Sequence, residues 1–283
     1  MTPTVLRDPA AVTAWADTAR QQGTRVGLVP TMGFLHRGHI SLMEAARARA
    51  DRTVVSIFVN PTQFGPGEDL DRYPRDFEGD LVKCAAAGMD AVFAPSPGAM
   101  YPPGHQTFVE VTGLSEGLCG ARRPGHFRGV ATVVTQLFAL VRPAVAVFGE
   151  KDWQQLQVVR RLALDLHLGV EVVGMPIVRE ADGLALSSRN AYLSPPDRER
   201  ALGLSRGLQG ARAAWASGMR EARVLCDAVR SALAAAGVRE DYVELVEPTT
   251  LVPLAIAERP DARLLVAGFV GTTRLIDNAP VGG

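Results

Sequence analysis

Features that define whole classes of proteins are scarce in this sequence. It has only three cysteines among 283 residues, and these (Cys84, Cys119 and Cys226) lie far apart and form no C-x-x-C pair. Neither a zinc knuckle nor a disulfide framework is therefore predicted. Small buried thiols in a reducing compartment are the better interpretation.

The sequence also lacks an excess of either charge. Thirty Lys and Arg residues balance thirty Asp and Glu residues, and the isoelectric point is near 7.0. Nucleic-acid-binding proteins more often carry a basic excess, so we expect no nucleic-acid partner. A neutral total is still compatible with a local basic patch.

Long apolar runs are missing as well. No uninterrupted run reaches the roughly 18 residues that a membrane helix needs. The first 15 residues contain Asp8 and two prolines, where a signal peptide has an apolar core. We therefore expect a soluble, cytoplasmic protein without a membrane partner.

What the sequence does contain is a regular alternation of short β-rich runs and longer helical patterns. Several runs are continuous stretches of Val, Ile, Phe and Ala, which is typical of strands buried on both faces of a parallel sheet. The candidate strands are residues 25–30, 52–60, 90–95, 108–113, 144–149 and 170–178. We expect an α/β fold with a Rossmann-like doubly wound parallel sheet.

The pattern changes after about residue 180. Two Ala- and Arg-rich helices, at about 195–217 and 219–236, precede a strand at 241–248 and a hairpin at 262–278 that turns at Gly268 or Gly271. We therefore expect two domains. Residues 1–178 form a Rossmann-like catalytic domain, and residues 179–283 form a smaller α+β domain that acts as a lid.

Polar clusters follow four of the predicted strands. They are "PTMGFLHRGH", "NPTQFG", "GEKDWQQ" and "READGLALSSRN". In open α/β sheets the ligand binds beyond the carboxyl ends of the strands. Such an arrangement is difficult to explain by folding requirements alone, so these segments are the candidate site.

The first of these loops carries His36 and His39 but not the G-x-G-x-x-G of a dehydrogenase-type dinucleotide site. A helix N-terminus can hold phosphate through its backbone N–H groups. Histidine donors can also stabilise charge that develops on phosphate oxygens. The alternative is that one histidine caps the helix and the other is merely exposed. A metal site is less favoured, because no third ligand lies at a suitable spacing.

"HRGH" resembles the H-x-G-H signature of the nucleotidylyltransferase superfamily, which is itself similar to the HIGH motif of class I aminoacyl-tRNA synthetases. That superfamily pairs the motif with a later basic, hydroxyl-rich loop, and "LSSRN" at 186–190 matches it. By itself "SSRN" could be an ordinary turn or helix cap. The two motifs together favour a triphosphate site.

Two further stretches narrow the resemblance. "FVNPTQFGPGEDLDRYPRD" (58–76) and "FGEKDWQQLQVVR" (148–160) resemble the pantothenate synthetases, the ligases of the coenzyme A pathway that join pantoate to β-alanine. Together with the other two segments they give four matches in family order over residues 30–190. Three positions depart from the commonest pattern: Arg37, Trp153 where Tyr or Phe is usual, and Leu186 where Met is usual.

The resemblance implies a reaction in two steps. The carboxylate of pantoate attacks the α-phosphorus of ATP and releases pyrophosphate, and the amine of β-alanine then displaces AMP from pantoyl adenylate. His39 is the expected proton donor, His36 lies beside it on the phosphates, and Lys151 is the expected cation on the α-phosphate. Gln63 and Gln155 are the expected pantoate ligands, and Gln63 also serves β-alanine.

The ATP-binding residues that the resemblance implies are Met32, Gly33, Phe34, Leu35, His36, Arg37, Gly38, His39, Gly149, Glu150, Lys151, Asp152, Val178, Leu186, Ser187, Ser188 and Arg189. Asn60, Arg123 and His126 are candidates of second rank near the same pocket. Mg²⁺ is expected with the triphosphate. Its protein ligand is not assigned, and Asp80 is the one candidate considered. A homodimer through the first domain is expected from the resemblance.

The same residues could also have purely structural roles. "EKD" could be a solvated charge run, Gln63 a loop cap, and Gln155 part of a wet helix face. Another nucleotidylyltransferase would keep the histidine loop but would have no reason for "NPTQF" or "GEKDWQQ". A tRNA synthetase would need a larger anticodon-binding part. A catalytically silent nucleotide-binding regulator would tend to lose Lys151 or the histidines.

Overall fold

The computed structural model describes residues 2–282 and divides into two compact units. Unit 1 comprises Met1–Glu150 and Gln155–Pro176, and unit 2 comprises Lys151–Gln154 and Ile177–Gly283. The chain therefore passes from unit 1 into unit 2 and back again around residues 150–155, before it enters unit 2 finally at residue 177.

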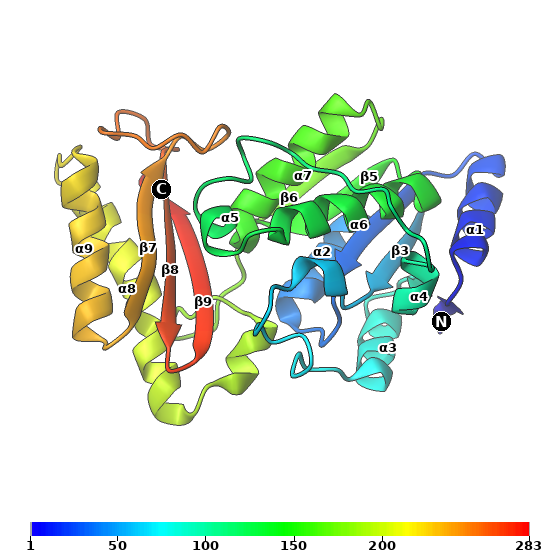
Figure 1. The fold of residues 1–283 in the computed structure, drawn as a ribbon, viewed down its shortest axis with the longest axis horizontal. Coiled ribbons are helices and arrows are strands. Elements are labelled where there is room, and N and C mark those ends of the chain that lie inside the picture. The colour runs from blue at the N-terminus through cyan, green and yellow to red at the C-terminus, as the bar shows by residue number, and fades with distance from the viewer. Residues whose placement is uncertain (1, 283) are drawn as a thin grey trace. The chain divides into compact units, whose positions relative to one another are not determined.

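Unit 1 is built on a six-stranded parallel sheet (Figure 1). Its strands are β1 (Thr4–Leu6), β2 (Val26–Thr31), β3 (Arg52–Ile57), β4 (Ala91–Phe93), β5 (Val145–Gly149) and β6 (Glu171–Met175), in the order β1-β4-β3-β2-β5-β6. Strands β3 and β4 are added to the sheet on one side of β2, and strands β5 and β6 are added on its other side. The topological switch point therefore lies between β2 and β5. The expected Rossmann-like doubly wound sheet is confirmed.

The switch point explains where the polar loops lie. Because β2, β3 and β5 are parallel and in register, their carboxyl ends meet at one edge of the sheet. The loops that follow them carry the "PTMGFLHRGH", "NPTQFG" and "GEKD" segments. In doubly wound sheets the crevice at this edge is the usual ligand site.

The helices of unit 1 cover both faces of this sheet. They are α1 (Pro9–Gln21), α2 (Arg37–Arg47), α3 (Phe77–Ala86), α4 (Pro97–Met100), α5 (Cys119–Arg122), α6 (His126–Val141) and α7 (Trp153–Asp165), whose first two residues belong to unit 2. Val147 of β5 packs in one core cluster with Met43 of α2. The next residue, Phe148, contacts Phe138 of α6 at 6.5 Å between ring centroids. Since neighbouring residues of a strand face opposite sides, α2 and α6 lie on opposite faces.

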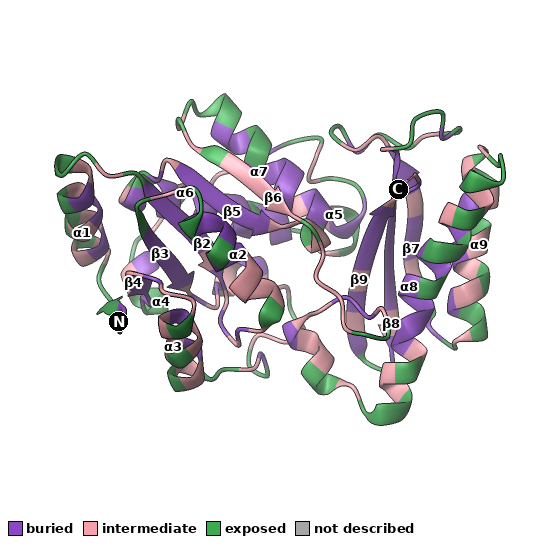
Figure 2. Ribbon diagram, turned by 180° about the vertical axis from the view of Figure 1, so that it is seen from behind, coloured by how far each residue is buried: buried purple, intermediate pink, exposed green. Residues whose placement is uncertain are grey.

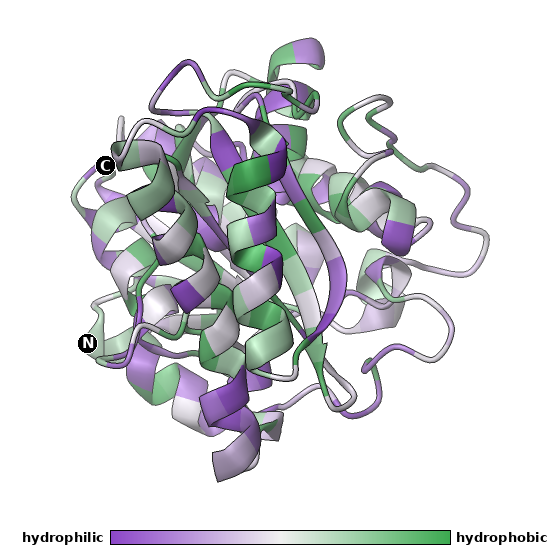
Figure 3. Cartoon of the chain, turned by 90° about the vertical axis from the view of Figure 1, so that its left-hand side faces the viewer, coloured by the Kyte–Doolittle hydropathy of each residue, from purple (hydrophilic) through white to green (hydrophobic). Residues whose placement is uncertain are grey.

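Unit 2 combines a three-stranded antiparallel sheet with two long helices. The strands β7 (Arg239–Val246), β8 (Arg263–Val270) and β9 (Thr273–Pro280) pair in that order, and the helices are α8 (Pro195–Ala216) and α9 (Ala222–Ala235). Hydrophobic and hydrophilic residues alternate along the helices (Figure 3). The apolar side of α9, with Leu225, Val229 and Leu233, packs with β8 in one core. The strands of this sheet are largely buried (Figure 2).

Three short 3₁₀ turns carry predicted site residues. They are η1 (Pro61–Gln63), η2 (Glu150–Asp152) and η3 (Ser188–Tyr192). The hairpin between β8 and β9 turns at Gly271, with φ +58°, whereas Gly268 lies inside β8. No helix within residues 2–282 is long and apolar enough to span a membrane.

One strand prediction is wrong. Residues 108–113 pair with no strand within residues 2–282, and of these residues only Val111 is buried. The Val109 N–H donates instead to Thr132 Oγ1 at 3.0 Å. The β-rich composition of this segment is therefore not matched by a neighbouring strand of the chain. Conversely, β1 is a three-residue edge strand, too short to predict from periodicity.

Candidate active site

The loop between β2 and α2 has an unusual backbone that depends on one buried carboxylate. Gly33 and Phe34 have φ of +83° and +50°, a region that costs little only for glycine. Asp80 of α3, 1% exposed, accepts hydrogen bonds from Phe34 N at 2.7 Å and from Leu35 N at 2.6 Å. Asp80 therefore fixes the histidine loop from helix α3.

His36 and His39 both cap helix α2. The Gly38 N–H donates to His36 Nδ1 at 3.1 Å, the His36 N–H donates to His39 Nδ1 at 3.3 Å, and the two rings lie 4.1 Å apart. A nitrogen that accepts from a backbone N–H carries no proton. In the neutral form each ring must therefore carry its proton on Nε2. Capping thus explains part of the H-x-x-H spacing, and it also defines Nε2–H as the donor of each ring.

The predicted pantoate ligand Gln63 is buried, at 8% exposure, next to the histidine loop. Its Nε2 donates to Met32 Sδ at 3.1 Å, and its Oε1 accepts from Asn60 Nδ2 at 3.1 Å. Asn60 is itself fixed by the Tyr101 hydroxyl, which donates to its Oδ1 at 2.8 Å. Met32, Asn60 and Gln63 are therefore brought together, and two of the four hydrogen-bonding positions of the Gln63 amide are in use.

Helix α6 approaches η1 closely enough to require glycine. A Cβ at Gly129 would lie 2.4 Å from Thr62 O and 2.6 Å from Gln63 N. The Gly129 carbonyl also accepts from Asn60 Nδ2 at 3.1 Å. The position of Gln63 is thus set directly by the packing of α6 against η1.

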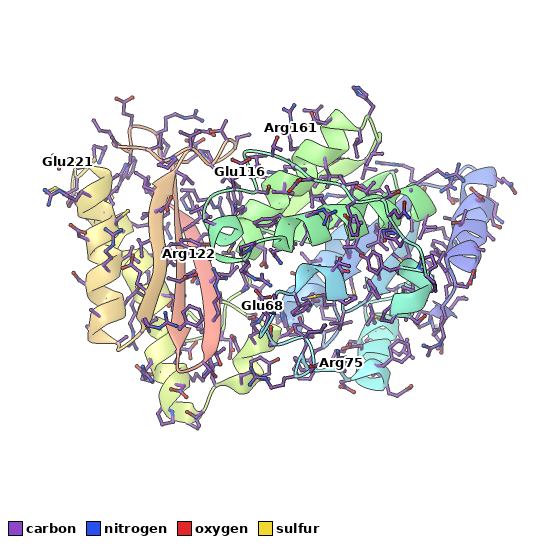
Figure 4. The ribbon with its side chains drawn as sticks, in the orientation of Figure 1. Glu68, Arg75, Glu116, Arg122, Arg161 and Glu221 are labelled. Atoms are coloured by element: carbon purple, nitrogen blue, oxygen red, sulfur yellow. The ribbon has the colours of Figure 1, made fainter. Side chains whose placement is uncertain are left out.

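The ion pair between Arg123 and Glu68 lies next to the backbone of Gln63. Arg123 donates to Glu68 through Nε at 2.8 Å and through Nη2 at 2.6 Å, and Glu68 lies on the loop after η1 (Figure 4). Arg123 also donates to His126 Nε2 at 3.1 Å. A guanidinium cannot accept a hydrogen bond, so His126 Nε2 is the acceptor and the ring carries its proton on Nδ1. This Nδ1–H donates to the backbone carbonyl of Gln63 at 2.8 Å.

The charge of this cluster is balanced inside unit 1. Burial would by itself raise the pKa of the Glu68 carboxyl, but the hydrogen bonds and charge of Arg123 lower it below its ordinary value. Arg123 and His126 both contact the backbone carbonyl of Gln63, through Arg123 Nη2 at 3.4 Å and His126 Nδ1 at 2.8 Å. Glu68 was missed, because an acidic residue in a loop is indistinguishable in sequence from a solvated one.

A second group of predicted residues belongs to unit 2. Lys151 lies in η2 with its Nζ 3.8 Å from Asp152 Oδ2, and its side chain is 19% exposed. Lys151, Ser187 and Asp277 line one small pocket of this unit. The Ser187 hydroxyl caps η3 by accepting from Arg189 N at 3.2 Å. Ser188 is buried within η3.

The remaining predicted residues are distributed between the units. The Leu186 N–H donates to the Val178 carbonyl at 3.0 Å, so these two residues of unit 2 are neighbours. Gln155, at the third position of α7, is half-buried and belongs to unit 1, as do Gly149 and Glu150. Residues 32–39 and 63 also belong to unit 1, whereas residues 151–152, 178 and 186–189 belong to unit 2.

Within residues 2–282, no group of three or more His, Cys, Asp or Glu side chains is arranged to hold a metal ion. Mg²⁺ that accompanies a nucleotide commonly keeps several waters and is held largely by phosphate oxygens.

Comparison with known proteins agrees with the motifs and the fold. Residues 4–280 match the family model described as pantoate-beta-alanine ligase. A pantothenate synthetase of Myxococcus xanthus is 65% identical over 285 residues, covering 100% of this chain and 98% of the relative. One of Anaeromyxobacter dehalogenans is 63% identical and covers 98% of each chain.

Solved structures give the same result. Pantothenate synthetase from Thermus thermophilus superposes with a TM-score of 0.93 at 49% identity, covering 99% of this chain and 100% of the other. Pantoate-beta-alanine ligase from Francisella tularensis, complexed with beta-gamma ATP and β-alanine, has a TM-score of 0.83 at 31% identity, covering 99% and 98%. The sequence resemblance is thereby confirmed, and the chain belongs to the pantoate–β-alanine ligase family.

Proposed function

We propose that this chain condenses pantoate with β-alanine in two steps driven by ATP. In the first step, a carboxylate oxygen of pantoate bonds to the α-phosphorus, the bond to the bridging oxygen breaks, and pyrophosphate leaves. In the second, the amine nitrogen of β-alanine bonds to the acyl carbon, loses a proton, and AMP leaves. The adenylate is needed because hydroxide is a very poor leaving group from a free carboxylic acid.

The observation that carries the proposal is the geometry of the histidine loop. His36 and His39 use Nδ1 to cap α2, so the donor of each neutral ring is its Nε2–H, a group suited to phosphate oxygens. The first step brings an anion to a polyanion. The site therefore needs positioned donors and positive charge more than a strong base.

The other residues take the roles that the family resemblance assigns. Lys151 is a compact cation for the α-phosphate, and Ser187, Ser188 and Arg189 bind the triphosphate. Asp152 binds the nucleotide, and Val178 contacts adenine through its backbone. Met32 to His39 and Gly149 to Asp152 line the ATP.

Gln63 holds pantoate together with Gln155, and Gln63 also contacts β-alanine. The contacts of the Gln63 side-chain amide with Met32 and Asn60 support this role, because they orient the amide and leave one donor and one acceptor position for a substrate. ATP and β-alanine as ligands are supported by the Francisella tularensis relative, which was solved with both. Mg²⁺ as the counter-ion of ATP, a homodimer, a cytoplasmic location and closure of the second domain as a lid stay predictions.

Both histidines cap helix α2, and both are proposed to donate to the phosphates during adenylation. The experiment must therefore separate these two roles. His36→Asn and His39→Asn each keep an amide oxygen near the place of Nδ1 that can accept the capping N–H, but both remove the ring Nε2–H donor. Each should slow pyrophosphate release about 10²- to 10³-fold, the usual effect of one lost transition-state donor. The reaction of β-alanine with chemically made pantoyl adenylate should be nearly unchanged.

Gln63→Ala is the contrasting variant and should slow both half-reactions, because its amide contacts both substrates. Rapid quench separates the two steps. If His36→Asn and His39→Asn release pyrophosphate at the wild-type rate, the histidines serve only as caps and the proposed mechanism is wrong. If pyrophosphate release does not depend on pantoate, the activity is that of another nucleotidylyltransferase.

A further inference from the structure

Two adjacent polar residues are buried in the middle of strand β9 of unit 2. Asp277 and Asn278 of β9, in "TRLIDNAP", are 3% and 2% exposed. Burying a carboxylate or an amide is costly unless its hydrogen bonds are satisfied. The two side chains leave opposite faces of the strand, so their partners show what each one holds.

Asp277 holds the segment that leads into the "SSRN" loop. Its carboxylate accepts two hydrogen bonds from Arg179, with Nη1 at 2.7 Å and Nη2 at 2.8 Å. Arg179 Nη1 also donates to the Gly183 carbonyl at 3.0 Å, and Arg179 forms a β-bridge with Ala185. The turn between residues 179 and 185 is thus attached to β9, directly before Ser187.

Asn278 holds the segment that carries Lys151. Its Nδ2 donates to the Lys151 carbonyl at 2.9 Å, and its Oδ1 accepts from Arg263 Nε at 2.7 Å. The guanidinium carbon of Arg263 lies 3.3 Å from the ring centroid of Trp153. Trp153 Nε1 donates to the Pro248 carbonyl at 2.7 Å. The backbone at residues 151–153 is therefore fixed to unit 2 by both of its ends.

We propose that Asp277 and Asn278 are positioning residues that hold Lys151 and the Ser187–Arg189 loop in one arrangement. Lys151, Ser187 and Asp277 line the same small pocket, so neighbouring residues of one strand reach both segments. The inference rests on the proposed function, because it requires Lys151 and residues 187–189 to act on ATP. Neither Asp277 nor Asn278 needs to touch a substrate.

The hydrogen bond from Asn278 to the Lys151 carbonyl matters because lysine has a long, flexible side chain. Its ammonium group can be aimed only if the backbone from which it extends is fixed, and a misplacement of about 1 Å can cost about 10²-fold in rate. A carbonyl hydrogen bond from a buried amide provides such a fixed point. Since Arg263 orients that amide, it belongs to the same arrangement.

Asn278→Asp is the sharpest variant, because it keeps the shape and the acceptor for Arg263, replaces the donor to the Lys151 carbonyl by an oxygen, and adds a carboxylate charge beside the Arg263 guanidinium. We expect it to slow pyrophosphate release about 10- to 100-fold at saturating ATP and pantoate. The β-alanine step with supplied pantoyl adenylate should keep its rate. Asp241→Asn is the matched control. It breaks the Arg274–Asp241 ion pair of the same sheet at 2.8 Å, which involves neither residue 151 nor residue 179, and it should be nearly wild type.

A double-mutant comparison tells positioning from a general structural effect. In a Lys151→Ala background, Asn278→Asp should cause no further loss of adenylation, because the group that it positions is gone. If the two losses multiply instead, Asn278 does not act through Lys151 and the inference is overturned. A wild-type rate for Asn278→Asp overturns it as well.

If Asn278→Asp fails to fold, Arg263→Lys takes its place in the same comparison. This variant keeps a cation near Trp153 but removes the Nε–H donor to Asn278. It should show a smaller loss with the same non-additivity, and additive losses would again overturn the inference. Failure of the proposed function is distinguishable, because Lys151→Ala alone would then adenylate pantoate at the wild-type rate.

Discussion

Replacing Gly129 by alanine tests whether the packing of α6 against η1 controls the substrate amide. An added Cβ would lie 2.4 Å from the Thr62 carbonyl oxygen, while ordinary contacts of such an atom begin at 3.4 Å. The backbone of η1 must therefore move outward by about 1 Å. Gln63, the last residue of η1, would move with it.

The free energies involved have opposite signs. Alanine is favoured over glycine in a helix interior by about 1 kcal/mol. Overpacking a tight interior contact costs about 1–3 kcal/mol. We therefore expect Gly129→Ala to leave the free energy of unfolding unchanged or to lower it by up to about 2 kcal/mol. A 1 Å displacement of Gln63 should, by contrast, lower turnover about 10²-fold, or about 2.7 kcal/mol in activation free energy.

The assay measures AMP release with all three substrates present, alongside urea unfolding. Gly210 of α8 provides the control, because an added Cβ there would meet no heavy atom within 4 Å. Gly210→Ala should gain stability and keep full turnover. If Gly129→Ala is stabilised like Gly210→Ala and turns over at the wild-type rate, the tight contact does not position Gln63.

Three further predictions concern ionisable groups. Asp80→Asn should lower the free energy of unfolding by about 1–3 kcal/mol and slow adenylation, because one loop N–H would then face an amide NH₂; urea unfolding and pyrophosphate release measure this. The lowered pKa of Glu68 stabilises the fold above its ordinary pKa of 4.5, and this contribution is lost as pH falls through the folded-state value. The stability difference between wild type and Glu68→Gln should therefore shrink in acid, and a constant difference would contradict it. Burial and the charge of Asp80 raise the pKa of Cys84 to about 12, so iodoacetamide at about pH 8 should label it only after unfolding, and labelling of the native protein would refute this.

Much of the candidate site could be predicted from local sequence. Residues 32–39, 60–63 and 149–152 each follow a buried strand run, and parallel strands necessarily end at a common edge of the sheet. The order of strands and helices along the chain therefore placed these loops together before any contact was known. Family motifs added the roles of individual residues, which composition and periodicity do not contain.

The contacts that hold these loops were not predictable, because they join residues far apart in sequence. Asp80 reaches the histidine loop from 45 residues away, and Glu68 is paired with Arg123 at a separation of 55. In the sequence each is one charged residue among many. The strand expected at 108–113 failed for a similar reason, since a strand needs a partner and its own residues do not specify one.

The sequence by itself determined the fold class, the family and the positions of the polar loops, because hydrophobic period and motif spacing are local properties of the chain. Only the tertiary structure decided which nitrogen of His36 and His39 carries the proton, and that Lys151 belongs to the unit of β8 and β9. In the sequence, Trp153 was a simple exchange of one aromatic ring for another. Its indole N–H bonds to Pro248 and its ring face meets Arg263, and these partners lie about a hundred residues away along the chain. A side chain's task depends on such distant neighbours, and these are brought to it only by the packing of the complete fold.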